Sequence, residues 1–588
     1  MWSRCQQEVI GFNAFYKREW FMVLQSLFKN RSMLFQRIKP VLLLLFITGY
    51  VSSQNTVGLI SKKEGATDGF TFVYPINQAN GYLVNSCGEL VNAWLDDPTF
   101  MAGAAAYITL DGQLLKTKRK INFAQDKIFA PGAGGIVELR SWDNGLLWQY
   151  ELNNEQFRLH HDIKLMPNNH ILMLVWEEKN REECIAAGRN PAFISDGKMY
   201  NEKIIEVDPA TNTITWEWSM WDHLIQDFDS TKANYGVIAD HPEKVDINLN
   251  TAGSFGLPNA DWMHINSFDY HPMLDQILIS APIFNEIMII DHSTTTQQAK
   301  GSTGGLGKKG GDLLFRWGNP TNYRQGTAAD QKLFFQHDTK WLIYDIPQNH
   351  PDFGKISLFN NRVTATTSWG AILSPPWDMY QWSYTQSGSS YGPVDFERKI
   401  VHPNPIKQNS PITSVVQLLP NNHIFSAAGN KGYCYELDKN GELLWEYVLP
   451  YRGFGPVSQG SILIPNDNPV FSFRRLHLSF PGFADKDMSA KSWIELNPDS
   501  TFCLRLTSTE STLNLEGNVP YPNPTTDQIN WFNKENVGNA YLYDSGGKIV
   551  KTIILANEKQ SISVEDLPGG FYCLVRGDQK HWIRVEKN

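Results

Sequence analysis

The chain has 588 residues, 42% of them hydrophobic and 19% charged, and this ordinary globular balance excludes wholesale disorder. Its net charge is −9 and no stripe of lysine and arginine runs along it, which argues against a nucleic-acid partner. An aromatic fraction of 12%, beside 44 glycines and 31 prolines, favours strands and turns, so the sequence predicts an all-β protein.

The first recognisable segment is a secretory leader that starts at Met33. Basic residues precede a short apolar run at 41–51, and small polar residues follow it. This pattern predicts a cleaved signal peptide at 33–53, and the run is too short for a comfortable membrane span. Residues 1–32 are then an upstream extension from a misassigned start, with a structured arm as the alternative. We expect export via the periplasm and no stable membrane span after the signal is removed.

The cysteines do not form a recognisable site. They are scattered along the chain as Cys5, Cys87, Cys184, Cys434, Cys503 and Cys573. Their spacing is neither that of metal ligands nor that of a dense disulfide framework. One disulfide is compatible with an oxidising compartment, and its pairing stays open.

A short pattern of a turn, a few apolar residues and an aromatic ending recurs through the chain. Its copies lie at 88–94, 144–150, 212–218, 311–317, 377–382 and 441–447. Each copy is a strand bounded by turn residues, and a four-stranded blade takes about 40 to 50 residues. Radial repetition protects sheet edges, so six copies predict a six-bladed β-propeller over residues 54–510. The alternative, a pair of β-sandwiches, does not explain six similar units.

A second strand pattern brings histidines to one repeat position. The stretches around His161 and Ser414 share Pro-Asn-Asn-His-Ile, which aligns these two residues. An apolar residue four places further on puts His264 and His337 at the same position. The innermost strands of a propeller line its channel, so we expect these side chains to meet there. A lone histidine at a strand end is more often a turn or core residue, but three at one position favour a functional cluster.

The residues beside these histidines argue against a metal site. Neutral imidazole is a common metal ligand, but the flanking Asp162 and Asp338 do not supply a clear fourth ligand. We expect the two carboxylates to orient or charge-stabilise the imidazoles. His160 has no repeat partner among the histidines and is expected to shape the channel.

Together, the stretches that carry these residues resemble the bacterial aryl-sulfate sulfotransferase family. They are HHDIKLMPNNHIL, ADWMHINSFDYHPMLDQILIS, FNEIMIIDHSTTT, GGDLLFRWGNP, LFFQHDTKW, VVQLLPNNHIF and GELLWEYVLP. They span most of residues 60–455. The resemblance implies a six-bladed propeller that transfers sulfate from an aryl sulfate donor to a phenolic acceptor without a nucleotide sulfate. We expect neither a cofactor nor a metal.

The resemblance also implies roles for individual residues. His337 is the nucleophile that becomes transiently sulfated, and neutral imidazole suits such covalent catalysis near pH 7. His264 and Asn266 are expected to donate hydrogen bonds to the sulfuryl oxygens in the transition state. His161 is expected to protonate the leaving phenolate and later to deprotonate the acceptor phenol. Ser414, aligned with His161, is expected to bind substrate.

One departure from the family concerns an arginine that helps to hold the sulfate. Pro282 stands where this arginine is expected. Loss of a charge-assisted contact weakens anion binding, and we expect Arg316 or another cation to substitute. The alternative function is a non-catalytic secreted propeller that binds an aromatic or anionic ligand or a surface partner. A metal- or quinone-dependent enzyme is a third alternative.

From Asn514 the composition changes, and residues 514–588 are predicted to form a separate small β-sandwich. Its stretches YPNP, YDSGGK and LPGGFY resemble the C-terminal sorting domain of type IX secretion substrates. Each stretch contains residues that favour a turn or an extended segment. The resemblance implies that the type IX secretion machinery is a partner and that the protein is secreted or displayed on the cell surface. A β-sandwich used for binding is the alternative.

Overall fold

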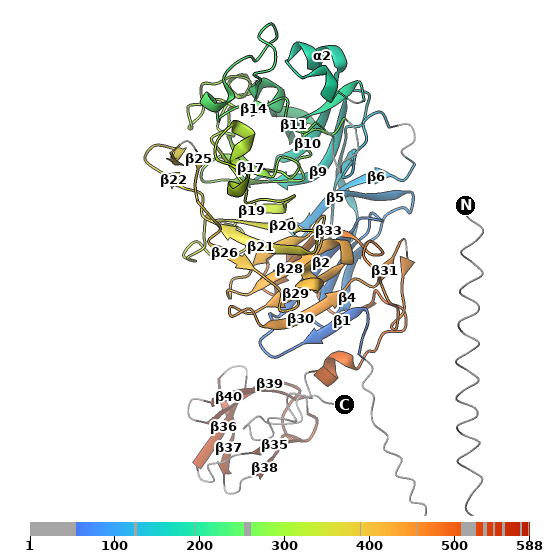
Figure 1. The fold of residues 1–588 in the computed structure, drawn as a ribbon. Helices are drawn as coiled ribbons and strands as arrows, with labels where there is room; N and C mark the ends of the chain where they lie inside the picture. Colours follow the sequence, from blue (N-terminus) through green and yellow to red (C-terminus); the bar gives the residue numbers. More distant parts are fainter. Residues whose placement is uncertain are drawn as a thin grey trace, which may run out of the picture. The chain divides into compact units, whose positions relative to one another are not determined.

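The computed structural model describes most of the chain from Gln54 onward (Figure 1). The described ranges are 54–122, 126–194, 196–251, 260–388, 390–453, 455–506, 525–532, 538–544, 547–555, 559–576, 579–585 and 587. The leader predicted at 33–53 and the extension predicted at 1–32 lie outside these residues.

Six groups of β-strands form the blades of a propeller, and the strands of each are given from the innermost outward. Blade 1 contains β33 (Val470–His477), β2 (Gly69–Pro75), β3 (Gly81–Asn85), β4 (Glu89–Trp94) and β34 (Ser492–Trp493). Blade 2 contains β5 (Phe100–Ile108), β6 (Leu114–Lys120), β7 (Ile136–Arg140) and β8 (Leu146–Glu151). Blade 3 contains β9 (Phe157–Leu165), β10 (Ile171–Asn180), β11 (Lys198–Asp208) and β12 (Thr213–Ser219).

The second half of the ring repeats this plan. Blade 4 contains β15 (Ser267–His271), β16 (Gln276–Ala281), β17 (Glu286–Asp291) and β18 (Phe315–Trp317). Blade 5 contains β19 (His337–Trp341), β20 (Ile356–Thr364), β21 (Thr367–Leu373) and β26 (Arg398–Ile400). Blade 6 contains β27 (Val415–Leu418), β28 (Ile424–Ala428), β29 (Tyr433–Leu437), β30 (Leu443–Val448) and β1 (Gly58–Lys62). The predicted all-β, six-bladed architecture is confirmed.

The innermost strands contact one another in a closed ring, in the order β33, β5, β9, β15, β19 and β27. Between blades 2 and 3 this contact includes a parallel bridge from Ala104 to His161. The two blades therefore form one continuous eight-stranded sheet. Equivalent strands from distant parts of the chain thus surround one axis.

The two ends of the propeller chain close the ring. The late strand β33 pairs with β2 and becomes the innermost strand of blade 1, while the first strand β1 pairs with β30 at the outer edge of blade 6. A disulfide joins Cys87 to Cys503 across a sequence separation of 416. The other cysteines within the described residues, Cys184, Cys434 and Cys573, are free.

A tryptophan of the aromatic repeat joins most blades to the next. The indole nitrogens of Trp94, Trp218 and Trp445 donate hydrogen bonds to backbone carbonyls of the following blade or of the segment leading into it, at 2.8 to 2.9 Å. Trp148 donates in the same way to the side chain of Asn212, at 2.7 Å. Burial of an indole is favourable when its N–H finds a partner, which explains the recurrence of the residue at this position.

One predicted copy of the repeat is wrong. The stretch 377–382 does not form the outer strand of blade 5, because that place is taken by β26. Trp377 instead belongs to the short hairpin of β22 (Trp377–Asp378) and β23 (Ser383–Tyr384). This hairpin lies in an insertion between the third and fourth strands of the blade, which displaces the pattern from its usual place.

The middle strands of blade 4 are buried on both faces. Every residue of β16 and β17 is buried, and most of them are isoleucine or another apolar residue. Branched side chains pack well on a pleated surface, and each one fully buried contributes about 1.5 to 3 kcal/mol. The rigid stack of blades fixes where the innermost strands present their side chains.

The remaining elements are short. The α-helices include α2 (Arg181–Ala186), α3 (Thr296–Ala299) and α4 (Pro405–Gln408), and residues 502–506 are also helical. The other two-stranded pairs are β13 (Leu224–Ile225) with β14 (Val245–Asp246), β24 (Gln386–Ser387) with β25 (Ser390–Tyr391), and β31 (Tyr451–Arg452) with β32 (Gly455–Pro456). Within the described part of the chain, no helix has the length and apolar character needed to cross a membrane.

The C-terminal segment forms a separate sandwich with its own core. One sheet pairs β35 (Gln528–Phe532) with β38 (Lys559–Ser563), and the other contains β37 (Ile549–Leu555), β36 (Gly538–Tyr543), β39 (Gly570–Arg576) and β40 (Gln579–Val585). Buried residues from both sheets, including Ile529, Leu542, Ile562 and Leu574, pack together. The predicted small β-sandwich is confirmed.

Candidate active site

In blades 3, 4 and 6 a residue in or shortly before the innermost strand has a left-handed backbone. The φ angles are 43° at His161, 58° at His264 and 87° at Ser414. In blade 5 the left-handed residue is Asp338, with φ of 52°, so His337 lies one residue before the position that the alignment gave it. Such conformations cost on the order of 1 to 3 kcal/mol and cluster at functional sites.

The side chains of His161, His264 and His337 nevertheless converge from blades 3, 4 and 5. The ring centroids of His161 and His264 are 4.6 Å apart, and the two ring planes are nearly perpendicular. The ring centroid of Phe471, on β33, lies 6.0 Å from that of His161 and 6.4 Å from that of His337. Each of the three histidines is at most 4% exposed, so the cluster lies in a nearly dry environment.

The tautomer of His337 follows from the hydrogen bonds of Asn361. The Asn361 amide nitrogen donates to the carbonyl oxygens of Ser410 and Thr413, both at 2.8 Å, which turns its oxygen toward His337. This oxygen lies 2.8 Å from His337 Nδ1 and can only accept, so Nδ1 carries the proton. The lone pair of His337 is therefore on Nε2.

Burial keeps the His337 imidazole neutral. Loss of solvation lowers its pKa from the ordinary value to about 3, and the nearby His264 and Arg362 also disfavour a positive charge. His337 thus presents an unprotonated Nε2 at neutral pH. This is the protonation state that a nucleophile requires.

The other two imidazoles have different partners. His264 Nδ1 lies 2.6 Å from the Asp261 carboxylate, an arrangement that orients the ring. His161 Nδ1 lies 3.0 Å from His160 Nδ1. Burial lowers the pKa of His161 well below its usual range, and the neighbouring histidines add to the effect.

Asn266 links the entrance of blade 4 to the segment before His337. Its side chain is fully buried and donates a hydrogen bond to the carbonyl of Gln336 at 2.7 Å. One of the two amide protons is therefore used to hold the backbone beside His337. The other remains as a hydrogen-bond donor of the kind that a sulfuryl oxygen accepts.

Most of the propeller matches the model of one known protein family. The model of the arylsulfotransferase (ASST) family matches residues 112–449. The chain belongs to the arylsulfotransferase family. The secretion system C-terminal sorting domain matches residues 520–585, so the protein is directed by type IX secretion to the cell surface or the extracellular space. Both resemblances seen in the sequence are confirmed.

Individual proteins match the chain only distantly or not at all. No curated protein matches the arylsulfotransferase chain. A protein of unknown function from Bacteroides caccae is 10% identical over 65% of this chain and 94% of its own, with a TM-score of 0.35. Virginiamycin B lyase from Staphylococcus aureus is 10% identical over 68% and 90% of the two chains, with a TM-score of 0.30. PorZ, a type IX secretion component from Porphyromonas gingivalis, is 10% identical over 84% and 59%, with a TM-score of 0.26.

The aspartates beside the histidines of the arylsulfotransferase domain join blades instead of orienting the imidazoles. Asp162 accepts hydrogen bonds from Lys340 and from the amide of Phe268. Asp338 forms a two-bonded ion pair with Arg474. The expectation for both carboxylates is corrected, because their charge is balanced by cations of other blades. Among the described residues no cluster of histidine, cysteine or carboxylate side chains could hold a metal ion.

Arg316 does not reach the imidazole cluster. It lies on β18, the outermost strand of blade 4, and is completely buried. Its guanidinium is paired with the Glu286 carboxylate at 2.6 and 2.9 Å and also donates to the Lys244 carbonyl. The expectation that Arg316 binds sulfate is corrected, since its charge is already compensated inside the blade.

A different arginine lies near His337. Arg362 follows Asn361 on β20, and its guanidinium lies over the ring of Phe335 at 3.5 Å from the centroid. The ring centroids of Phe335 and His337 are 5.6 Å apart. Pro282 itself lies in the turn between β16 and β17, where the amide of Asn285 donates to its carbonyl. A cation near His337 thus comes from blade 5, which the sequence reasoning missed.

Ser414 occupies the corresponding entrance of blade 6. Its hydroxyl oxygen accepts a hydrogen bond from the Gly429 amide at 3.1 Å, and the side chain is 2% exposed. Gly429 packs against the carbonyl of Val470, the residue before Phe471. Ser414 therefore belongs to the same end of the ring. Among the described residues, its hydroxyl does not form a hydrogen bond with a histidine.

Several residues of the site were missed from the sequence. Asp261, three residues before His264, carried a usable signal, because an acidic residue at that spacing suits a histidine partner. Glu202 gave no such signal, because Lys203 and Glu206 lie with it on strand β11. Phe471 and Asn361 gave no signal of their own, because their partners are distant in the sequence.

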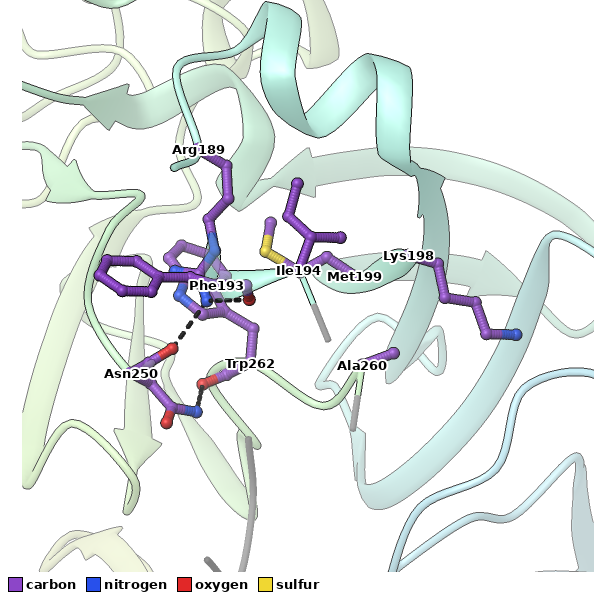
Figure 2. A pocket seen from close by; sticks show the side chains of 8 residues that line it. All are labelled: Arg189, Phe193, Ile194, Lys198, Met199, Asn250, Ala260 and Trp262. Atoms are coloured by element: carbon purple, nitrogen blue, oxygen red, sulfur yellow. Dashed lines mark hydrogen bonds between the residues drawn. The ribbon is translucent and has the colours of Figure 1, made fainter. Parts of the chain in front are cut away.

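A small hollow lies beside α2 and β11 (Figure 2). It is lined by Arg189, Phe193, Ile194, Lys198, Met199, Asn250, Ala260 and Trp262. The Arg189 guanidinium donates to the carbonyls of Phe193 and Asn250 at 3.2 and 2.7 Å, and to two further carbonyls. Its donors are occupied by the backbone, so this hollow does not resemble an anion site.

Proposed function

We propose that this arylsulfotransferase moves a sulfuryl group from an aryl sulfate ester to a phenol through a covalent intermediate on His337 Nε2. The observation that carries the proposal is the neutral His337 imidazole, held as the Nδ1–H tautomer by Asn361 within a cluster of three histidines. The lone pair on Nε2 attacks sulfur, and the bond from sulfur to the phenolic oxygen breaks. A phenol then takes the group from the histidine in the reverse sense.

The neighbouring donors suit the charge that develops in such a transfer. The sulfuryl oxygens carry negative charge throughout, and donors fixed in a buried site stabilise it more than water does. We assign this role to the Asn266 amide and to His264, whose ring is held by Asp261. His161 is assigned to the phenolic oxygen, as acid in the first half of the reaction and as base in the second.

The direct test is the intact mass of the purified protein after mixing with 4-nitrophenyl sulfate. We expect release of nitrophenol and a mass increase of one sulfuryl group that disappears when a phenol is added. Tight binding of the aryl sulfate with neither release nor adduct would instead identify a ligand-binding propeller without transfer activity.

Arg362 is expected to compensate for the arginine that Pro282 replaces. We predict that Arg362→Gln lowers kcat/KM for an aryl sulfate donor about 10- to 100-fold, mainly through KM, because a charge-assisted contact to an anion is worth about 1.5 to 3 kcal/mol. Steady-state kinetics with 4-nitrophenyl sulfate measure the effect. The matched control is Arg452→Gln, which removes the same charge from an exposed ion pair with Asp467. Equal kinetics for the two variants would exclude Arg362 from donor binding.

A further inference from the structure

Behind the imidazole cluster, buried side chains form a path that ends at Glu202. His161 Nδ1 is 3.0 Å from His160 Nδ1, and His160 Nε2 is 3.0 Å from Glu202 Oε2. The last contact is within hydrogen-bonding distance but departs from ideal geometry, and neither atom has another partner among the described residues. The side chains of His160 and Glu202 are fully buried.

Trp176 holds His160 and Glu202 in place. Its ring stacks on that of His160 with centroids 4.1 Å apart and planes 5° apart. Its indole nitrogen donates to Glu202 Oε1 at 3.3 Å, and the Ile265 amide donates to the same oxygen at 2.9 Å. The other carboxyl oxygen is thereby left facing His160.

The path has two self-consistent hydrogen-bond patterns, both with neutral imidazoles. In the first, protonated Glu202 donates to His160 Nε2, His160 Nδ1–H donates to His161 Nδ1, and His161 carries its proton on Nε2. In the second, every proton has shifted by one bond, so that Glu202 is a carboxylate and His161 Nε2 has a lone pair. The first pattern offers an acid at Nε2 and the second offers a base.

The proposed reaction needs such an arrangement because His161 cannot store a proton as an imidazolium. Its burial and the neighbouring histidines keep it neutral at physiological pH. A neutral imidazole that gives up its Nε2 proton must receive another at Nδ1, since an imidazolate is far too basic to leave behind. His160 is the group in position to supply it.

We propose that Glu202 is the proton reservoir of the transfer and acts on the substrate through His160 and His161. This inference rests on the proposed function. In the first half-reaction His337 Nε2 forms a bond to sulfur while the phenolic oxygen leaves with the His161 Nε2 proton. His161 takes a proton from His160, which takes one from Glu202, and the carboxylate retains the remaining charge. The acceptor phenol returns a proton along the same path.

The surroundings of Glu202 favour the protonated form in the resting protein. Its pKa is raised to about 8, chiefly by burial and also by the nearby Asp261 carboxylate, while the Ile265 amide, His264 and Trp176 act in the opposite direction. A group with this raised pKa is protonated below pH 8, which corresponds to the first pattern. The acid needed for the first half-reaction is therefore available at neutral pH.

The test compares two donors in single-turnover release of the phenol, with Glu202→Gln in the full chain. Glutamine can still donate to His160 but cannot give up a proton. Phenyl sulfate releases a phenol whose ordinary pKa is about 10 and needs protonation, whereas 4-nitrophenolate is a far better leaving group. We expect the variant to lose about 10²-fold with phenyl sulfate and less than about threefold with 4-nitrophenyl sulfate.

The control is Glu177→Gln on the neighbouring strand β10, a buried carboxylate that binds Asn201 and Lys179 and not the histidines. It should leave the ratio of the two donors unchanged. The wild-type protein gives an independent readout, since its rate with phenyl sulfate should fall as the pH rises through about 8, while its rate with 4-nitrophenyl sulfate should not.

A purely structural Glu202 would slow both donors by the same factor or neither, and that result overturns the relay. So does a wild-type rate with phenyl sulfate that shows no decline above pH 8. Failure of the proposed function is distinct, because the wild-type protein would then release no phenol from either donor and gain no sulfuryl group.

Discussion

Replacement of His337 by alanine is expected to lower nitrophenol release from 4-nitrophenyl sulfate by about 10³-fold or more and to remove the sulfuryl adduct. The reason is that alanine takes away the lone pair that attacks sulfur, and the remaining donors stabilise charge without forming the intermediate. Initial rates and intact mass measure the two effects together. Thermal unfolding should stay cooperative, because the change removes a side chain from the ring without breaking a blade.

A matched control is available in His402→Ala. His402 is also buried, and its Nε2 bonds to the Tyr433 hydroxyl at 2.9 Å, but it lies outside the imidazole cluster. This variant should retain both the rate and the adduct. A sulfuryl adduct that persists on His337→Ala would show that another residue is the nucleophile.

Loss of the disulfide is expected to produce the largest change in stability. The double variant Cys87→Ser with Cys503→Ser should unfold about 3 to 5 kcal/mol more easily, since the native bond closes a loop of 416 residues and restricts the unfolded chain. Urea titration followed by tryptophan fluorescence measures the difference. The same loss should appear when the wild-type protein is unfolded in reductant.

Cys573→Ser is the matched control for this prediction, because Cys573 is free and lies in the C-terminal sandwich. It should unfold at the wild-type urea concentration. The double variant itself should not respond to reductant. If wild type and double variant share one midpoint under oxidising conditions, the bond does not contribute to stability.

The aromatic repeat could be recognised in the sequence because its requirements are local. An outer blade strand needs a turn, alternating apolar residues and an indole for the next blade, and these requirements are written within a few residues. Five of the six copies form the fourth strand of a blade. The copy at 377–382 misled because an insertion places similar residues outside the blade, and local pattern cannot distinguish the two locations.

Whether an arginine is free to bind an anion could not be predicted from the sequence. Arg316 looked suitable for an anion because arginine often binds one, yet its partner Glu286 lies on the adjacent strand and neutralises it. Arg362 looked unremarkable, yet the fold brings it toward His337. Whether a guanidinium is available depends on which carboxylate or carbonyl reaches it, and sequence spacing alone does not settle this.

By itself, the sequence determined the all-β class, the six-fold repetition, the sorting domain and the histidines at the starts of inner strands, because each has a signature within one repeat. The tertiary structure decided that His337 carries its proton on Nδ1, that Asp162 and Asp338 join blades, and that Glu202 stands behind His160. Protonation and charge depend on solvation and on partners from other strands. Those partners meet only when the ring closes.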